Sequence, residues 1–425
     1  MALDRTGTTH LKINKSRIKQ RLKTLSQFGL NQNGGIDRSF AGKADAEARK
    51  WFLSLWGGLF SQKVKIDAAA NLWAGIHDEK TLKPIVLGSH HDAVANGGKY
   101  DGAVGVILAT EVLQTIYDHQ IPMRHPLKIV SFSAEEPNPF NVSTLGSRSV
   151  TGVIDQNDLK PIVHSETGER IVDAIKRMGG DVSKLEADRL KPDSLAVFLE
   201  CHIEQGRHLY DSHHSLAVVT AITGIYRDKV TIKGEANHAG TTLMQNRHDA
   251  LAAAAELTLA FENLLKAMNR DDTVGTIGYM KISPNSANII PGEAELIIEI
   301  RTSDDEQLKR ILREIDRDIQ RIEKERGVSI DKQNLLNQKA APMNGQVIKA
   351  LEETLAQMNE PYLKLPSMAG HDSVHMVPIG RAGMIFVPSI KGRSHCPDEK
   401  TAIDDIAKAG QLMLNTILKL DKELD

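Results

Sequence analysis

Three short apolar runs, each followed closely by histidine or acidic residues, constrain the fold of this chain more than any other feature. The runs lie at residues 84–88, 127–132 and 197–199, and the motifs after them are Ser-His-His-Asp (89–92), Ala-Glu-Glu-Pro (134–137) and Cys-His-Ile-Glu-Gln (201–205). Continuous apolar runs of this kind are typical of strands buried on both faces of a parallel sheet. Because sites form at the carboxyl edge of such sheets, the runs predict a site there.

The rest of the chain predicts two domains, one of which interrupts the other. From about 40 to 212, apolar strands alternate with helical patterns, which indicates an α/β fold with a mainly parallel sheet covered by helices on both faces. From about Ala217 the order is strand, helix, strand, strand, helix, at residues 218–222 and 229–233, 247–267, 273–282, 294–301 and 305–326. This order is typical of a small antiparallel sheet with two helices on one face. We therefore expect a catalytic domain at 1–216 and 333–425 and an inserted α+β domain at 217–332.

Length and composition fit a cytoplasmic enzyme. A chain of 425 residues is long for a single core. The chain has 53 Lys and Arg residues and 55 Asp and Glu residues, and its net charge is −2. This charge does not favour binding to nucleic acid or to an anionic membrane. The first seven residues lack the apolar segment of a secretory signal. Cys201 and Cys396 are interpreted as small residues that face away from the site, the alternative being redox-sensitive thiols or auxiliary ligands.

The motifs contain the residue types that a two-metal hydrolytic site needs. With Tyr-Asp-Gly (100–102) and Ser-His-Cys-Pro (394–397), they offer three imidazoles and two carboxylates: His90, His202, His395, Asp101 and Glu136. Divalent ions prefer such ligands, and two ions can lower the pKa of a shared water. Any one motif is common by chance, and a lone histidine at a strand end is usually solvated. The position of several motifs at the ends of apolar runs favours the metal-site interpretation.

Spacing within the motifs suggests a division of roles. His90 and Asp92 are two residues apart at a strand end and therefore point to the same side. Asp92 can then hold the second ring nitrogen of His90, which is a common role for a carboxylate behind a metal ligand. His91 points the other way and is not counted as a ligand. Glu135 and Glu136 are adjacent, so one can bind metal while the other takes a proton from water.

The chain resembles a known group of enzymes from about Gly42 to its C-terminus. The motifs that carry the resemblance are Gly-Ser-His-His-Asp (88–92), Asn-Gly-Gly-Lys-Tyr-Asp-Gly (96–102), Leu-Gly-Ser-Arg (145–148), His-Ile-Glu-Gln-Gly (202–206), Gly-Glu-Ala-Asn-His-Ala-Gly-Thr-Thr (234–242), Gly-His-Asp-Ser (370–373) and Met-Ile-Phe-Val-Pro-Ser (384–389). They are similar to motifs of the N-carbamoyl-L-amino-acid hydrolases, allantoate amidohydrolases and β-ureidopropionases. That group belongs to the clan of dinuclear-zinc aminoacylases and aminopeptidases.

The resemblance implies a role for each matched residue. Five residues would hold two divalent ions per subunit, with zinc expected and manganese, cobalt or nickel as alternatives: His90 and His202 for one ion, Glu136 and His395 for the other, and Asp101 between them. Glu135 would be the general base and acid, and Asp92 would orient His90. Peptidase members of the clan usually carry an acidic residue where this chain has His202, so the histidine points to the carbamoyl and ureido branch.

Four further residues match positions that contact substrate in that branch: Gln205, His238, Asn288 and Arg301. Arg301 would hold a substrate carboxylate through two parallel hydrogen bonds, and His238 would stabilise the oxyanion. From spacing alone, His238 could equally be a structural loop histidine and Arg301 a surface ion-pair residue. Two departures from the family pattern, at residues 137–142 and at Leu243, leave the exact substrate open.

The expected function is a metal-dependent amidohydrolase that cleaves the carbamoyl C–N bond of a small carboxylate. The expected substrate is an N-carbamoyl-L-amino acid, with release of ammonia and carbon dioxide; allantoate and β-ureido acids are alternatives. A dipeptidase or N-acyl amino-acid hydrolase on the same scaffold and a catalytically silent binding protein are further alternatives. The resemblance also implies a homodimer paired through the inserted domain, which would act as a lid. No nucleic-acid or membrane partner is expected.

Overall fold

The computed structural model describes residues 11–60, 64–77 and 79–424, so the segment searched for a secretory signal lies outside it. The chain divides into two compact units, one comprising residues up to 220, 343–365 and 371 onward, and the other comprising 221–342 and 366–370. The expected end of the inserted segment, at 332, falls inside strand β12 (Ser329–Gln338). Among the described helices, none combines the length and the apolar character needed to span a membrane.

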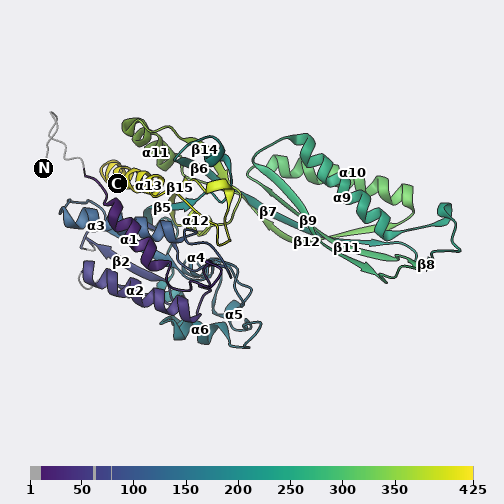
Figure 1. The fold of residues 1–425 in the computed structure, drawn as a ribbon, viewed down its shortest axis with the longest axis horizontal. Coiled ribbons are helices and arrows are strands. Elements are labelled where there is room, and N and C mark those ends of the chain that lie inside the picture. Colours follow the sequence, from purple (N-terminus) through teal and green to yellow (C-terminus); the bar gives the residue numbers. More distant parts are fainter. Residues whose placement is uncertain (1–10, 61–63, 78, 425) are drawn as a thin grey trace. The chain divides into compact units, whose positions relative to one another are not determined.

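The first unit is built on a mixed sheet (Figure 1), whose strand order is β1-β2-β4-β3-β5-β15-β6-β13, with β14 paired to β6. The central strands β4, β3, β5 and β15 are parallel, whereas β1, β2 and β6 join antiparallel. The expected mainly parallel sheet is thus correct only for the centre. The strand expected at 218–222 was assigned to the inserted domain, but it forms β6 of this sheet and pairs antiparallel with β15. The strands are β1 (Lys65–Ile66), β2 (Leu72–Ile76), β3 (Ile85–His90), β4 (Leu127–Phe132), β5 (Leu195–Ile203), β6 (Ala217–Ile222), β13 (Ala341–Pro342), β14 (Leu363–Ser367) and β15 (Gly380–Val387).

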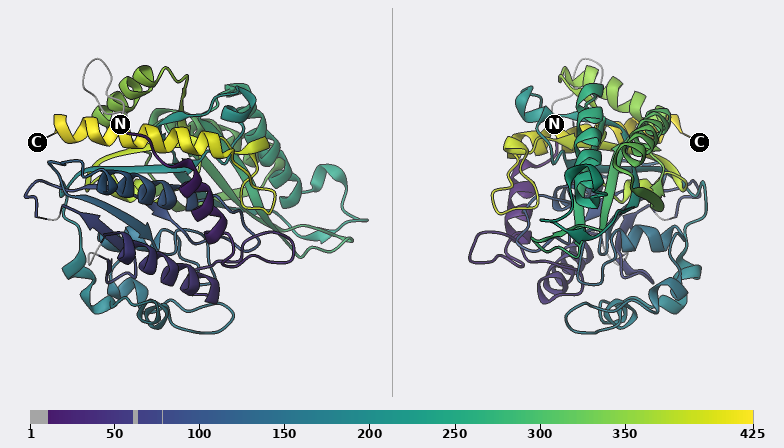
Figure 2. Two further views of the ribbon diagram at one scale, coloured as in Figure 1. Left: turned by 60° about the vertical axis from the view of Figure 1, so that its left-hand side comes forward. Right: turned by 90° about the vertical axis from the view of Figure 1, so that its right-hand side faces the viewer.

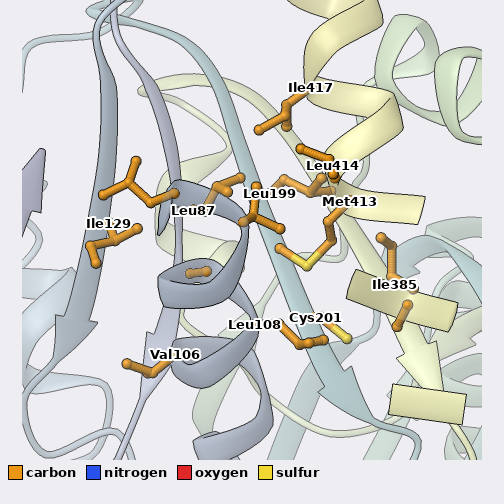
Figure 3. Packing of buried hydrophobic residues seen from close by; sticks show 14 of the residues in the cluster. Leu87, Val106, Leu108, Ile129, Leu199, Cys201, Ile385, Met413, Leu414 and Ile417 are labelled. Atoms are coloured by element: carbon orange, nitrogen blue, oxygen red, sulfur yellow. The ribbon is translucent and has the colours of Figure 1, made fainter. Parts of the chain in front are cut away.

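Both faces of the central strands are buried, as their continuous apolar runs predicted. On β3, Leu87 packs into the core of one face and Val86 into the core of the other, and Leu199 and Phe198 divide in the same way on β5. Neighbouring side chains on a strand point to opposite faces, which explains this division. Figure 3 shows side chains of β3, β5, β15 and two helices meeting in the larger core.

Helices cover the sheet of the first unit on both faces. Residues Ala103 to Ile116 of α3 are all buried, because α3 contacts β3, β4 and β5 as well as α1, α2 and α13. Figure 2 shows α13 as the long yellow helix next to the C-terminus. The helices are α1 (Lys15–Leu25), α2 (Lys43–Phe60), α3 (Ala103–Asp118), α4 (Leu145–Val150), α5 (Gln156–Leu159), α6 (Ile171–Arg177), α7 (Leu185–Asp188), α8 (His208–Asp211), α11 (Gly345–Met358), α12 (Ser373–Met376) and α13 (Ile403–Glu423), with 3-10 turns at Val182–Lys184 and Ile390–Gly392.

The second unit is an antiparallel sheet in the order β12-β7-β11-β9 that packs against two helices. On α10, Ile311, Ile315, Ile319 and Ile322 recur every three or four residues and are buried in its core, which is the pattern of an amphipathic helix. A separate pair of short strands, β8 and β10, carries part of the expected substrate site. The elements are β7 (Gly224–Lys233), β8 (Asn237–His238), a 3-10 turn (Met244–Asn246), α9 (Ala250–Met268), β9 (Thr273–Ser283), β10 (Ile289–Ile290), β11 (Glu293–Thr302), α10 (Asp305–Arg326) and β12.

Candidate functional site

The carboxyl ends of the central parallel strands bring the histidine and acidic motifs of the first unit together. His90 is the last residue of β3, and His202 is the penultimate residue of β5. Glu135 and Glu136 follow the end of β4 by a few residues, and all four side chains are buried. Because these strands lie side by side in parallel register, their ends meet at one edge of the sheet.

One group of possible metal ligands consists of His90, Asp101 and His202. His202 Nε2 lies 3.1 Å from Asp101 Oδ1, and His90 Nε2 lies 3.5 Å from the same oxygen. The two Nε2 atoms are 3.5 Å apart. His90 Nδ1 lies 3.2 Å from the Asp92 carbonyl oxygen, and His202 Nδ1 lies 2.9 Å from the Ile203 carbonyl oxygen. Nδ1 of each neutral ring is therefore the donor, which leaves a lone pair at Nε2, as a metal-binding imidazole requires.

A second group consists of Asp101, Glu136 and His395. His395 Nε2 lies 3.2 Å from Glu136 Oε1 and 3.4 Å from Asp101 Oδ2. Asp101 thus turns one carboxylate oxygen toward each group, which is the arrangement of a bridging ligand. Burial raises the pKa of Asp101, but the rings of His202, His395 and His90 together hold it well below its usual range.

The donor set of these two groups fits divalent metal ions. Glu136 Oε1 is buried and has no hydrogen-bond partner among the described residues, although His395 is close. An unpaired buried carboxylate oxygen is costly, and a cation held by the same group would satisfy it. Burial raises the pKa of Glu136, and the neighbouring Asp101 carboxylate raises it further. Nitrogen and oxygen donors of this kind suit zinc and related ions.

Glu135 belongs to neither ligand group but lies directly beside the first. Its Oε2 is 3.6 Å from His90 Nε2. Burial raises the pKa of Glu135 well above its usual range, His90 opposes the shift, and Glu136 and Asp372 add to it. A carboxylate with a raised pKa that is free of ligand duty is suited to take up and return a proton.

Asp92 contacts more than His90, which spacing alone did not predict. The Asp92 carboxylate Oδ1 is 3.5 Å from His90 Nδ1, whereas the backbone carbonyl oxygen of Asp92 is 3.2 Å from the same nitrogen. The same carboxylate accepts hydrogen bonds from the backbone N–H groups of Glu135 and Glu136, at 3.2 and 3.1 Å. Asp92 therefore holds the paired-glutamate turn as well as the imidazole.

His91 and Cys201 lie where the sequence interpretation expected. The His91 ring contacts Asp45 Oδ1 at 2.8 Å and Ser131 Oγ at 2.6 Å, away from both ligand groups. Cys201 is buried in the larger core (Figure 3), where burial raises the pKa of its thiol. Cys396 is half-buried, and both thiols are free.

Close packing around the first group depends on Gly102. This residue has a φ of 60°, a conformation that favours glycine. A Cβ atom at position 102 would lie 2.4 Å from the His90 ring. No other residue type fits between His90 and the start of α3, and the Tyr-Asp-Gly motif therefore serves the geometry of Asp101 and His90 together.

Of the residues expected to bind substrate, Gln205 lies in the first unit. Its Nε2 donates to Asp101 Oδ2 at 2.6 Å and is 3.3 Å from His395 Nε2. The amide therefore contacts the second ligand group. Its Oε1 is buried without a hydrogen-bond partner among the described residues, which leaves an acceptor at the edge of the site.

His238 and Asn288 are neighbours in the second unit, where β8 pairs with β10. The Ala239 N–H donates to the Asn288 carbonyl at 3.0 Å. His238 Nδ1 accepts from the backbone N–H groups of Gly240 and Thr241, at 3.1 and 3.2 Å. Nδ1 is therefore an acceptor, and the proton of the neutral ring is on Nε2.

Arg301 lies at the other end of the second unit's sheet. Its Nε donates to Glu299 Oε1 at 2.8 Å, and its Nη1 donates to the Met368 carbonyl at 3.0 Å. The eight steps along β11 from Glu293 to Arg301 span roughly 26 Å at about 3.3 Å per residue. Glu293 pairs with Lys233, close to where the chain continues to β8. A small molecule therefore cannot contact Arg301 and His238 of one unit at the same time.

Sequence reasoning missed three buried carboxylates beside the ligands. Glu200 accepts from Ser89 Oγ at 2.7 Å and from Ser373 Oγ at 2.6 Å. Asp372 accepts from Ser147, and Glu399 contacts the loops of Asp101 and His395. Glu200 left a usable signal, since it is the one acidic residue in a strand that is apolar apart from it and His202. Asp372 stands in the Gly-His-Asp-Ser motif, whereas Glu399 lies in a polar loop that offers no such contrast.

Comparison with known proteins identifies the family of this architecture. The family model described as peptidase family M20/M25/M40 matches residues 86–419. The N-carbamoyl-L-amino acid amidohydrolase of Geobacillus stearothermophilus is 34% identical over 96% of this chain and 99% of its own length. The ureidoglycolate hydrolase of Arabidopsis thaliana is 33% identical over 96% of this chain and 87% of its own. A crystal structure of a hydantoinase/carbamoylase family amidase from Burkholderia multivorans has a TM-score of 0.86 and 26% identity, covering 97% of this chain and 99% of that one.

Proposed function

The chain belongs to peptidase family M20/M25/M40 and is an amidohydrolase acting on C–N bonds other than peptide bonds, and we propose that it hydrolyses the carbamoyl bond of an N-carbamoyl-L-amino acid at a two-metal site. The observation that carries the proposal is the pair of ligand groups that share Asp101, with Glu135 free beside them. The names of the relatives support a ureido substrate. Allantoate, β-ureido acids and ureidoglycolate are alternative substrates, and N-acyl amino acids or dipeptides are less well supported.

The proposed reaction assigns each proton transfer to a residue of the chain. His90, Asp101 and His202 would hold one divalent ion, and Asp101, Glu136 and His395 a second. When bound, such ions lower the pKa of water and stabilise negative charge on oxygen. Glu135 accepts the proton of the attacking water as a new C–O bond forms at the ureido carbon. It then returns that proton to the amino-acid nitrogen as its C–N bond breaks. The carbamoyl group leaves as carbamic acid, which breaks down to ammonia and carbon dioxide.

His238 is proposed as the donor that stabilises the oxyanion of the tetrahedral intermediate. The two backbone N–H groups at its Nδ1 support this role, because they keep the proton of the neutral ring on Nε2. A neutral donor held in a fixed orientation is effective in such a position. Asn288, whose backbone accepts from the same loop, is proposed to contact the substrate beside it.

A homodimer is proposed because one chain separates residues that a small substrate must contact together. Within one chain, the distance between Arg301 and His238 is about the length of β11. A site that uses both residues would therefore take His238 from a second copy of the chain. The edge strand β9 supports such pairing, since Val274, Tyr279 and Met280 are exposed on it. Exposed edge strands with apolar side chains are suited to association. The second unit is proposed to close over the substrate as a lid.

Arg301→Ala is expected to lower kcat/KM for carboxylate substrates mainly by raising KM, by roughly 2–4 kcal/mol, because a charged partner is left unpaired. Arg301→Lys should restore little, since lysine lacks the two-pronged geometry. Steady-state kinetics on acid and amidated forms of one substrate measure the effect. Arg227→Ala is the matched control, because Arg227 pairs with the same Glu299 from the adjacent strand. Equal rates for acid and amide substrates in the unmodified enzyme would exclude Arg301 as the carboxylate receptor.

Ammonia release across a substrate panel tests the proposed substrate. We expect the highest kcat/KM for an N-carbamoyl-L-amino acid, with lower values for allantoate, ureidoglycolate and β-ureido acids. A preference for one of those three compounds would keep the reaction type and replace the substrate. No ammonia from any ureido compound, with hydrolysis of dipeptides instead, would overturn the proposal.

A further inference from the structure

Glu399 joins two loops that lie about three hundred residues apart in the chain. Its Oε1 accepts hydrogen bonds from the backbone N–H groups of Tyr100 and Asp101, at 2.8 and 3.0 Å. Its Oε2 accepts from Ser394 Oγ and from the His395 backbone N–H, at 3.1 and 3.3 Å. The side chain is buried. Its carboxylate accepts from three backbone N–H groups and shares the Ser394 hydroxyl with Asp101 Oδ2, which lies 3.0 Å from the same Oγ.

The fit of Glu399 depends on a glycine in the first of these loops. A Cβ atom at Gly98 would lie 1.9 Å from the Glu399 carboxyl group, so any larger residue would displace it. The loop at residues 96–102 therefore passes directly over the carboxylate.

The two ligand loops differ in how much other support they have. The Asp101 loop leads directly into α3, where the Val104 N–H donates to the Tyr100 carbonyl at 2.9 Å. His395 lies in an irregular segment with a φ of 55°, and its side chain is 44% exposed. Its backbone N–H bonds to Glu399. Loss of Glu399 should therefore displace His395 more than Asp101.

We propose that Glu399 is a positioning residue that holds His395 in register with Asp101 and thereby sets the metal affinity of the group Asp101, Glu136 and His395. This inference rests on the proposed metal ligation. It predicts an asymmetric defect, because His90 and His202 are fixed by strands β3 and β5 and do not contact Glu399 among the described residues. Partners that orient ligands typically contribute about 10–100-fold to metal affinity.

Titration of metal-free protein with Zn²⁺, followed by calorimetry and by competition with a chromogenic chelator, tests the proposal. The unmodified chain should bind two ions. The Glu399→Gln side chain has one acceptor oxygen in place of two. The variant should bind the ion of His90 and His202 normally and the ion of Glu136 and His395 about 10–100-fold more weakly. Ser394→Ala removes a hydroxyl that contacts both Glu399 Oε2 and Asp101 Oδ2, so it should weaken the same ion and serves as a second variant. Asp398→Asn is the matched control, since Asp398 is exposed and pairs with Arg393.

Two results would overturn the inference. One is a folded Glu399→Gln protein, verified by circular dichroism, that binds both ions with unchanged affinity. The other is an equal weakening of both ions, which would mean that Glu399 supports the fold in general. Binding of fewer than two ions by the unmodified chain would contradict the proposed two-metal site itself. This result is distinguishable from a failure of the Glu399 proposal, because it appears without any variant.

Discussion

Glu135→Gln is expected to lower kcat by at least about 10²–10⁴-fold, the usual cost of removing a general base, while the bound metal is retained. Glutamine has nearly the same size but cannot accept the proton of the attacking water. Its neighbour Glu136 faces the second ligand group, whereas Glu135 belongs to neither group. Steady-state kinetics together with metal analysis of the purified variant measure both parts of the prediction.

Glu136→Gln is the matched control for this variant, because it makes the same change one residue away. It should weaken metal binding, since Glu136 Oε1 faces His395 and has no other partner among the described residues. A Glu135→Gln enzyme with near-normal kcat would exclude Glu135 as the base. Loss of metal from that enzyme would instead make Glu135 a ligand.

Mixing two inactive variants, His238→Ala and Glu135→Gln, is expected to restore activity. If His238 acts in the site of the neighbouring subunit, each mixed dimer contains one site with both groups intact. Random exchange between symmetric dimers would then return up to about a quarter of the unmodified activity. The physical basis is the distance along β11 that separates Arg301 from the His238 loop within one chain.

A second mixture controls for this effect. Glu135→Gln and His395→Ala alter two residues of the same unit, so their mixed dimers contain no intact site and should stay inactive. Subunit exchange is verified separately with differently tagged chains. Exchange without recovery in the first mixture would place His238 in the site of its own chain. A chain that is monomeric at assay concentration would contradict the dimer itself.

The sequence predicted the well-capped and strongly patterned elements of the fold. The expected helix at 305–326 coincides with α10, where Asp304 caps the start and Gly327 the end. Strand β12 was missed because its sequence, Ser-Ile-Asp-Lys-Gln-Asn-Leu-Leu-Asn-Gln, is polar and mostly exposed at an edge of the sheet. Edge strands with few buried residues leave little periodic pattern to read.

The sequence also predicted which side chains gather in the first unit, because apolar strands in parallel register deliver their carboxyl ends to one place. His90, Glu136 and His202 could be found in this way. His395 stood in a motif of its own, but its place beside Asp101 and Glu136 came from the family resemblance, because it lies several residues beyond the end of β15. The contacts of Glu200 and Glu399 depend on how distant loops pack, which spacing along one chain does not encode.

Release of the free amino acid from the N-carbamoyl and N-acetyl forms of one L-amino acid tests the central claim most directly. The assay compares enzyme freed of metal by exhaustive chelation with the same enzyme after addition of zinc, manganese, cobalt or nickel. The metal-free enzyme should cleave neither compound, and the restored enzyme should cleave the N-carbamoyl form with the higher kcat/KM. Full activity after chelation, or faster cleavage of the N-acetyl form, would contradict a metal-dependent carbamoyl amidohydrolase.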